Sequence, residues 1–201
     1  MSLRDILTGR HQLQGPAPDK LFAISTAYVT LESEYGIAPT GTAAIVFQAL
    51  ATSDFESTLR DTEEVVKATG GESGTQVASQ DDSYGYRWLV VRNAPGKASV
   101  EDLAVALNAV SSSMESAGYG ERLLCAVFAF EEARPGAGAG SERPVHFIYN
   151  YKRGYWYPFV PDAGSEQRST ERELQLKAQI GSELPIEPEL ERWFPLWGIP
   201  I

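Results

Sequence analysis

Apolar and polar residues alternate along two neighbouring stretches between residues 145 and 159, and this pattern predicts a β-hairpin. Every second position over residues 145–151 is apolar or aromatic, so one face of the first strand is expected to be covered. The turn is expected at Arg153 and Gly154, because glycine can adopt the positive φ of a short hairpin loop. The return strand repeats the alternation at Tyr155, Tyr157 and Phe159.

Apolar residues at spacings of three and four predict helices before and between the strands. The clearest helix begins after Ser99, whose hydroxyl is expected to cap it, and ends at Gly118. Another is expected to be capped by Ser53, with Glu56 three residues later, and to end at Gly70 and Gly71. The remaining two helices are predicted over residues 19–35, closed by Gly36 and Pro39, and over residues 166–180.

Four further stretches have the character of strands. Residues 84–92 place Tyr84, Tyr86, Trp88 and Val90 on one face and Leu89 and Val91 on the other. The run LLCAVFAF within residues 122–131 is apolar on both faces, which predicts a central strand that is covered on both sides. Shorter strands are predicted over residues 42–48 and 75–79, the second followed by a turn at residues 80–83.

The order of these elements predicts an α+β fold. Residues 42–131 read β-α-β-β-α-β, which is the ferredoxin-like order, and the hairpin and a C-terminal helix are added to it. We therefore expect a two-layer sandwich with a mainly antiparallel sheet. Residues 1–18 are interpreted as an N-terminal amphipathic segment and linker, and residues 19–201 as a single α+β domain with an aromatic tail.

The two ends of the chain carry apolar residues outside these elements. Leu3, Ile6 and Leu7 fall on one side of a short predicted helix, which could touch a membrane peripherally, touch a partner, or pack on its own domain. Near the other end, Pro185, Pro188 and Pro195, three prolines that come before the last residues, rule out a long helix over residues 183–201. The tail tryptophans Trp193 and Trp197, with Phe194 between them, are expected to lie across the domain as an extended lid.

Composition narrows the classes of function. The formal net charge of -10 repels nucleic-acid phosphates and anionic lipid headgroups, so nucleic acid is not expected as a partner. Cys125 is the only cysteine, which excludes an intrachain disulfide and favours a reducing cytoplasm. No stretch has the length of a transmembrane helix, and the N-terminus lacks the features of a secretion signal.

The reactive side chains do not form a recognisable catalytic set. Cys125 and His146 could act as nucleophile and base if neighbouring strands brought them together, but a thiol in apolar company is usually inert. His11 and His146 are too far apart in sequence to present two metal ligands on one face. No enzyme activity, metal or cofactor is therefore predicted.

Four sequence blocks resemble one family. They are DSYGYRWLV at 82–90, AGYGERLLCAVFAF at 117–130, YKRGYWYPFVP at 151–161 and ELPIEPELERWFPLWG at 183–198. Together with the short opening helix before a proline-rich linker, they are similar to the PspA-associated protein PspAB family. The resemblance implies a cytoplasmic bacterial or archaeal protein linked to the phage-shock-protein-A envelope-stress system, with no established reaction.

The resemblance and the aromatic residues together suggest a binding surface. A PspA-like protein is a long coiled coil, so a groove for a helix face is a plausible recognition device. The expected partner-binding residues are Tyr151, Lys152, Arg153, Gly154, Tyr157, Pro158, Arg192, Trp193, Phe194 and Trp197. We expect a non-enzymatic adaptor or regulatory protein that binds a PspA-like protein or an associated factor, and the alternative is a small-ligand-binding protein or enzyme with a pocket under the C-terminal aromatic segment.

Overall fold

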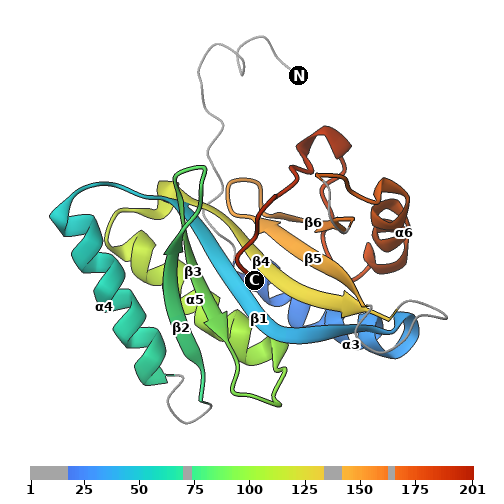
Figure 1. Cartoon of the computed structure of the whole chain (residues 1–201), viewed down its shortest axis with the longest axis horizontal. Coiled ribbons are helices and arrows are strands. Elements are labelled where there is room, and N and C mark those ends of the chain that lie inside the picture. Colours follow the sequence, from blue (N-terminus) through green and yellow to red (C-terminus); the bar gives the residue numbers. More distant parts are fainter. Residues whose placement is uncertain (1–17, 70–73, 134–141, 163–165) are drawn as a thin grey trace.

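Six strands form one sheet in which every neighbouring pair is antiparallel (Figure 1). The computed structural model describes residues 18–69, 74–133, 142–162 and 166–201. The order in the sheet is β2-β3-β1-β4-β5-β6, so β1 and β4 are central, as the apolar LLCAVFAF run predicted for β4. The strands are β1 (Ile37–Gln48), β2 (Gln76–Asp81), β3 (Tyr86–Arg92), β4 (Leu123–Glu132), β5 (Arg143–Asn150) and β6 (Tyr155–Phe159).

The helices pack on one face of this sheet. They are α2 (Pro18–Phe22), α3 (Ile24–Tyr35), α4 (Ser53–Thr69), α5 (Val100–Ser116) and α6 (Thr170–Ile180), with short 3-10 turns η1 (Gly120–Arg122) and η2 (Leu190–Arg192). The chain order β1-α4-β2-β3-α5-β4 is the predicted ferredoxin-like order, followed by the β5–β6 hairpin and α6. The predicted α+β sandwich is therefore confirmed.

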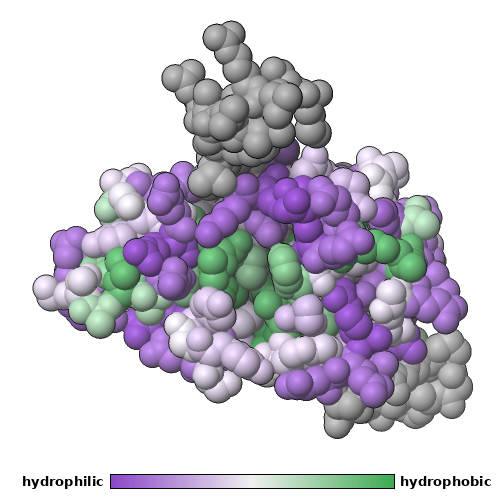
Figure 2. All heavy atoms as spheres, turned by 90° about the horizontal axis from the view of Figure 1, so that it is seen from above, coloured by the Kyte–Doolittle hydropathy of each residue, from purple (hydrophilic) through white to green (hydrophobic). Residues whose placement is uncertain are grey.

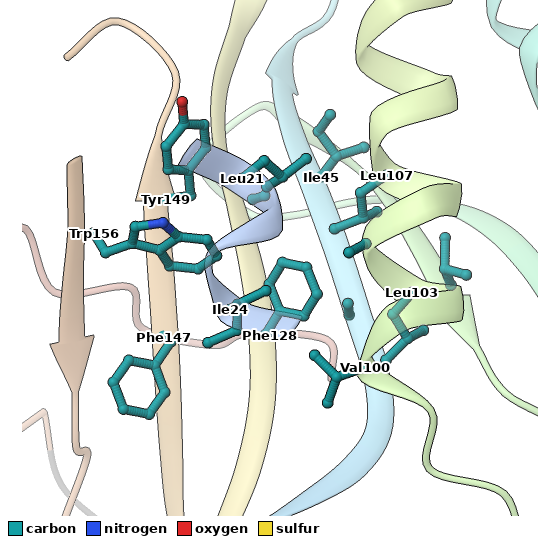
Figure 3. Packing of buried hydrophobic residues seen from close by; sticks show 14 of the residues in the cluster. Leu21, Ile24, Ile45, Val100, Leu103, Leu107, Phe128, Phe147, Tyr149 and Trp156 are labelled. Carbon is teal, nitrogen blue, oxygen red and sulfur yellow. The ribbon is translucent and has the colours of Figure 1, made fainter. Parts of the chain in front are cut away.

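The core between the sheet and the helices follows from the side-chain period of about 3.6 residues in a helix and of 2 residues in a strand. One apolar stripe of α5, including Leu103 and Leu107, faces the sheet, where it meets Ile45 of β1 (Figure 3). Farther along the sheet, large rings from β4, β5 and β6 pack against α2 and the start of α3. These rings are Phe128, Phe147, Tyr149 and Trp156, each almost fully buried.

Two predictions about helix ends are confirmed, and two predictions about helices are wrong. Ser99 accepts a hydrogen bond from the Asp102 backbone N–H at the start of α5, and Gly36 ends α3 with a φ of 64°. The prediction that Ser53 caps α4 is wrong, because Thr52 supplies the capping oxygen to the Phe55 N–H, at 3.3 Å. The single helix predicted over residues 19–35 is two helices, α2 and α3, that meet at residue 23.

The strand β1 begins five residues before its predicted start. Pro39 was interpreted as a helix terminator, but it lies in β1 opposite Phe130 of β4, before the pairing with β3 begins at Thr42. Because this part of β1 has a neighbour on one side only, the missing proline N–H costs little. Gly41 follows with a φ of 74°, at the point where the register with β4 shifts.

Other predicted boundaries shift by a few residues. Gln80 and Asp81 belong to β2 and not to the following turn, and α6 begins at Thr170 and not at residue 166. The predicted N-terminal helix, the linker and the helix end at Gly70 and Gly71 lie outside the described residues. Among the helices that the structure describes, none combines the length and apolar character needed to cross a membrane.

Candidate binding groove

The second face of the sheet is covered by the C-terminal segment, residues 183–201, which we call the tail (Figure 1). The tail first runs beside β6, where the Trp156 N–H donates to the Pro185 carbonyl and the Glu187 N–H donates to the Trp156 carbonyl. It then crosses the sheet, and Trp193 packs on the ring of Tyr157 with the ring centroids 6.3 Å apart. The lid expected from the sequence is therefore present and is part of a second apolar core.

Two arginines hold the tail in place, one by an ion pair and one by a hydrogen bond. Arg153 from the β5–β6 turn pairs with Glu187, whose side chain is only 2% exposed. Arg168, just before α6, pairs with buried Glu173 at 2.7 Å and also donates to the Trp193 carbonyl at 2.6 Å. Burial raises the pKa of the Glu173 carboxyl above its ordinary value, and the hydrogen bonds from Arg168 oppose that rise.

The β5–β6 turn is longer than the two-residue turn expected. It runs from Tyr151 to Gly154, and the side-chain oxygen of Asn150 accepts hydrogen bonds from the N–H groups of Lys152 and Arg153. Gly154 has the expected positive φ, 67°. This geometry sends the Lys152 side chain to the edge of the second face and the Arg153 side chain toward the tail.

A groove of about 480 Å³ opens between the tail and the β2–β3 turn. It is lined by the β2–β3 hairpin, the tail and β6, together with residues of β1, β4, the end of β5 and the β5–β6 turn. We call it the aromatic groove, after the six rings that line it: Tyr84, Tyr86, Trp88, Tyr157, Phe194 and Trp197. Tyr84 and Phe194 are the most exposed of these rings, at 62% and 57%.

The groove lies toward the end of the sheet where the β2–β3 and β5–β6 turns come together (Figure 1). Seen from that end, hydrophobic residues gather in the middle of the molecule and hydrophilic residues surround them (Figure 2). Apolar surface left open to water and rimmed by polar residues is typical of sites for proteins or ligands.

The polar groups of the groove are few, and most are already engaged. Asp82 accepts hydrogen bonds from the Trp88 indole N–H at 2.8 Å and from the backbone N–H groups of Tyr84 and Tyr86, which fixes the β2–β3 turn. Lys152 is exposed at the rim, and its ammonium group has no partner within the described ranges. The groove therefore offers aromatic surface with one available cation.

Cys125 and His146 do not form a nucleophile–base pair. Cys125 lies on the floor of the groove opposite Asn150, whereas His146 lies opposite Ala129, four residues along β4 and thus about 13 Å away. Burial raises the pKa of the Cys125 thiol to about 12 and lowers that of His146 to about 4. Within the part of the chain that the structure describes, no three His, Cys, Asp or Glu side chains gather as metal ligands do.

The ten residues predicted to bind a partner are divided by the structure. Lys152, Tyr157, Phe194 and Trp197 line the groove. Arg153 and Arg192 lie in ion pairs with the tail carboxylates of Glu187 and Glu189, and Trp193 is buried between the tail backbone and the sheet. Tyr151, Gly154 and Pro158 are buried, and Tyr151 packs on the helix-side core.

Three of the groove rings, Tyr84, Tyr86 and Trp88, were not predicted as part of the site. The alternation predicted that these three side chains share one face of the strand. It did not predict that this face lies against the tail. The predicted strand order contained the missing signal: in a ferredoxin-like sheet β3 begins at the same end as β4, and a hairpin after β4 returns to that end.

The fold and the groove define an α+β domain with an open groove lined mainly by aromatic rings. A comparison with family models matches residues 1–201 to PspAB, described as PspA associated protein B, so the chain belongs to that family. Comparisons with curated proteins and with solved structures each gave no match.

Proposed function

We propose that this protein is a non-enzymatic, cytoplasmic adaptor or regulatory protein of a PspA-like envelope-stress system. In this proposal the aromatic groove binds a PspA-like coiled-coil protein or an associated factor. The observation that carries it is the groove itself, in which exposed rings from the β2–β3 hairpin and the tail face one open space. Membership of a family named for association with PspA supports the choice of partner.

The chemistry of the groove suits a protein partner. Tyrosine and tryptophan contribute most of the binding energy at many interfaces, because each buries a large area at little cost in side-chain entropy. A groove lined in this way accommodates the apolar stripe of an amphipathic helix. Lys152 at the rim can pair with an acidic residue at the border of that stripe.

Binding to a purified PspA-like protein, measured by calorimetry, tests the proposal. The variant Tyr84→Ala, Phe194→Ala removes two exposed groove rings and is expected to weaken binding at least tenfold, as loss of interface anchors does. The matched control is Val105→Ala, Leu190→Ala, which removes exposed apolar side chains outside the groove. Equal affinity of the two variants, or no binding by the wild type, would rule the proposal out.

A second candidate is a small apolar ligand held in the same groove. The volume of about 480 Å³ is the observation that favours it, because ligand pockets span roughly 300–1,000 Å³. Native mass spectrometry of the purified protein is then expected to detect a bound apolar molecule that Trp197→Asp releases. A protein that carries no such molecule and does not bind apolar fluorescent dyes would exclude this candidate.

A further inference from the structure

The described chain begins beside the turn that borders the aromatic groove. Lys20 in α2 accepts a hydrogen bond through its carbonyl from the Trp156 indole N–H at 2.8 Å. Its ammonium group lies 5.4 Å from the ring centroid of Tyr155 and packs close to Gly154. Lys152 of the same turn lines the groove, so the described chain begins next to the turn that forms part of the groove rim.

The segment that precedes α2 is long enough to reach the groove. Seven residues, 11–17, connect residues 1–10 to Pro18, and an extended chain advances about 3.3 Å per residue, so this linker can span about 23 Å. Because α2 packs on the helix side of the sheet and the groove opens on the second face, this linker has to pass around the β5–β6 turn to reach the rim.

The sequence of this segment suits an apolar groove on an acidic domain. Leu3, Ile6 and Leu7 repeat at spacings of three and four, which gives an apolar stripe of the kind that helix-in-groove recognition uses. Arg4 and Arg10 outweigh the single acidic residue Asp5, whereas the chain as a whole carries a net charge of -10. An apolar, mildly basic segment is therefore attracted to the acidic domain that carries the groove.

We propose that residues 1–10 bind in the aromatic groove of their own chain. Tethering keeps their effective concentration near the millimolar range, so even a weak contact of a few apolar side chains is populated. The segment then acts as an internal competitor that an external partner must displace. This inference rests on the geometry of the groove and not on the identity of the partner proposed above.

The indole N–H signals of the full-length protein provide the test, by NMR without any partner present. Of the four tryptophans, Trp88 and Trp197 line the groove, whereas Trp156 is buried in the helix-side core and serves as an internal reference. The variant Leu3→Asp, Leu7→Asp is expected to shift the Trp88 and Trp197 signals and leave Trp156 in place. The control His11→Asp, Leu13→Asp adds the same charge to the same segment and is expected to shift none of them.

Adding the peptide and varying the protein concentration distinguish docking on the same chain from docking on a second copy of the chain. A synthetic peptide of residues 1–15, added to the Leu3→Asp, Leu7→Asp variant, is expected to move both groove signals back toward their wild-type positions. The wild-type signals are expected not to depend on protein concentration. Unchanged Trp88 and Trp197 signals in the variant would overturn the proposal, and so would concentration-dependent signals, which place the segment on a second copy of the chain.

Alkylation of Cys125 by a neutral maleimide gives an independent readout. Cys125 is the only cysteine and lies on the groove floor with 8% exposure, so its modification reports access to the groove. We expect the rate to rise at least threefold in Leu3→Asp, Leu7→Asp and to be unchanged in the control variant. Equal rise in both variants would point to a general loosening of the fold and contradict the docking of Leu3 and Leu7.

Discussion

Neighbouring aromatic residues of the β5–β6 hairpin go to opposite faces of the sheet. Tyr149 and Trp156 oppose each other across the two strands and enter the helix-side core, with ring centroids 5.2 Å apart. Ile148 and Tyr157 form the next pair and face the tail. The two-residue period of a strand therefore decides which rings stabilise the main core and which belong to the groove.

The ion pair between Arg153 and Glu187 is a residue-scale contact with a measurable role. We expect Arg153→Met to lower the free energy of unfolding by about 1–3 kcal/mol, because the almost fully buried Glu187 carboxylate loses its charged partner. Urea unfolding provides the measurement. Arg192→Met, which breaks an exposed pair with Glu189, is the control and is expected to have little effect. Equal stability of both variants would show that the Arg153 pair does not anchor the tail.

His146 is expected to make stability depend on pH. Burial lowers its pKa in the folded protein to about 4 from the ordinary 6.5, so between these pH values the unfolded chain binds a proton that the folded protein does not. Acidification through this window is therefore expected to cost about 3 kcal/mol of stability from this group alone.

The contribution of His146 is isolated by comparing the wild type with His146→Phe in urea unfolding at several pH values. The replacement keeps a ring against Phe159, whose centroid lies 6.1 Å from that of His146. As the pH falls from 6.5 to 4, the unfolding free energy of the wild type should decrease steadily relative to that of His146→Phe. His11→Phe is the control, and a pH dependence lost equally in both variants would contradict the assignment to His146.

At the scale of elements, the tail is the segment whose role the sequence specified least. Its prolines excluded a long helix and its rings predicted a cover, but which rings would be buried depends on contacts with distant residues. Trp193 is held by the Glu187 carbonyl, which accepts from its indole N–H at 3.0 Å. The backbone of its neighbour Phe194 is held by the Tyr157 hydroxyl, which donates to the Phe194 carbonyl at 3.1 Å. The Phe194 ring itself lines the groove.

Replacing these two tail rings should have opposite consequences. Trp193→Ala is expected to reduce the free energy of unfolding by about 3–5 kcal/mol, because it leaves a cavity beneath the tail next to Tyr157. Phe194→Ala is expected to change it by no more than about 0.5 kcal/mol, because the ring is largely exposed. Chemical denaturation measures both. If the two losses are similar, the tail does not pack as described.

The sequence predicted most of the elements and part of the groove, and the reasons are local. The alternation in β3 and the stripe of α5 report directly on burial, so both were placed within two residues. The early part of β1 was missed because Pro39 and Gly41 are breakers in most settings and are tolerated here beside a single neighbouring strand. The groove could not be predicted in full, because Tyr84 and Phe194, which line it together, are 110 residues apart and no local pattern brings them together.

At the scale of the whole molecule, the sheet is covered on one face by helices and on the other by an extended segment with little regular structure. The second core contains Val46 of β1, Trp88 and Val90 of β3 and Val127 of β4, and the tail supplies Trp193 with several partly buried residues around it. An apolar sheet face of this kind is stable in water only when something covers it. The tail is therefore expected to be needed for the folded monomer as well as for the groove.

Removal of residues 186–201 tests this role. The shortened protein is expected to bind an apolar dye such as anilinonaphthalene sulfonate several-fold more strongly than the full chain and to self-associate, because the second sheet face is uncovered. Dye fluorescence and light scattering measure the two effects. Removal of residues 199–201 is the control: it deletes the contact of Arg92 with the Pro200 carbonyl and the partly buried Ile199 and Ile201 but leaves Trp193 in place, so a much smaller change is expected. A shortened protein that stays monomeric with wild-type dye binding would mean that the second sheet face does not require the tail as a cover.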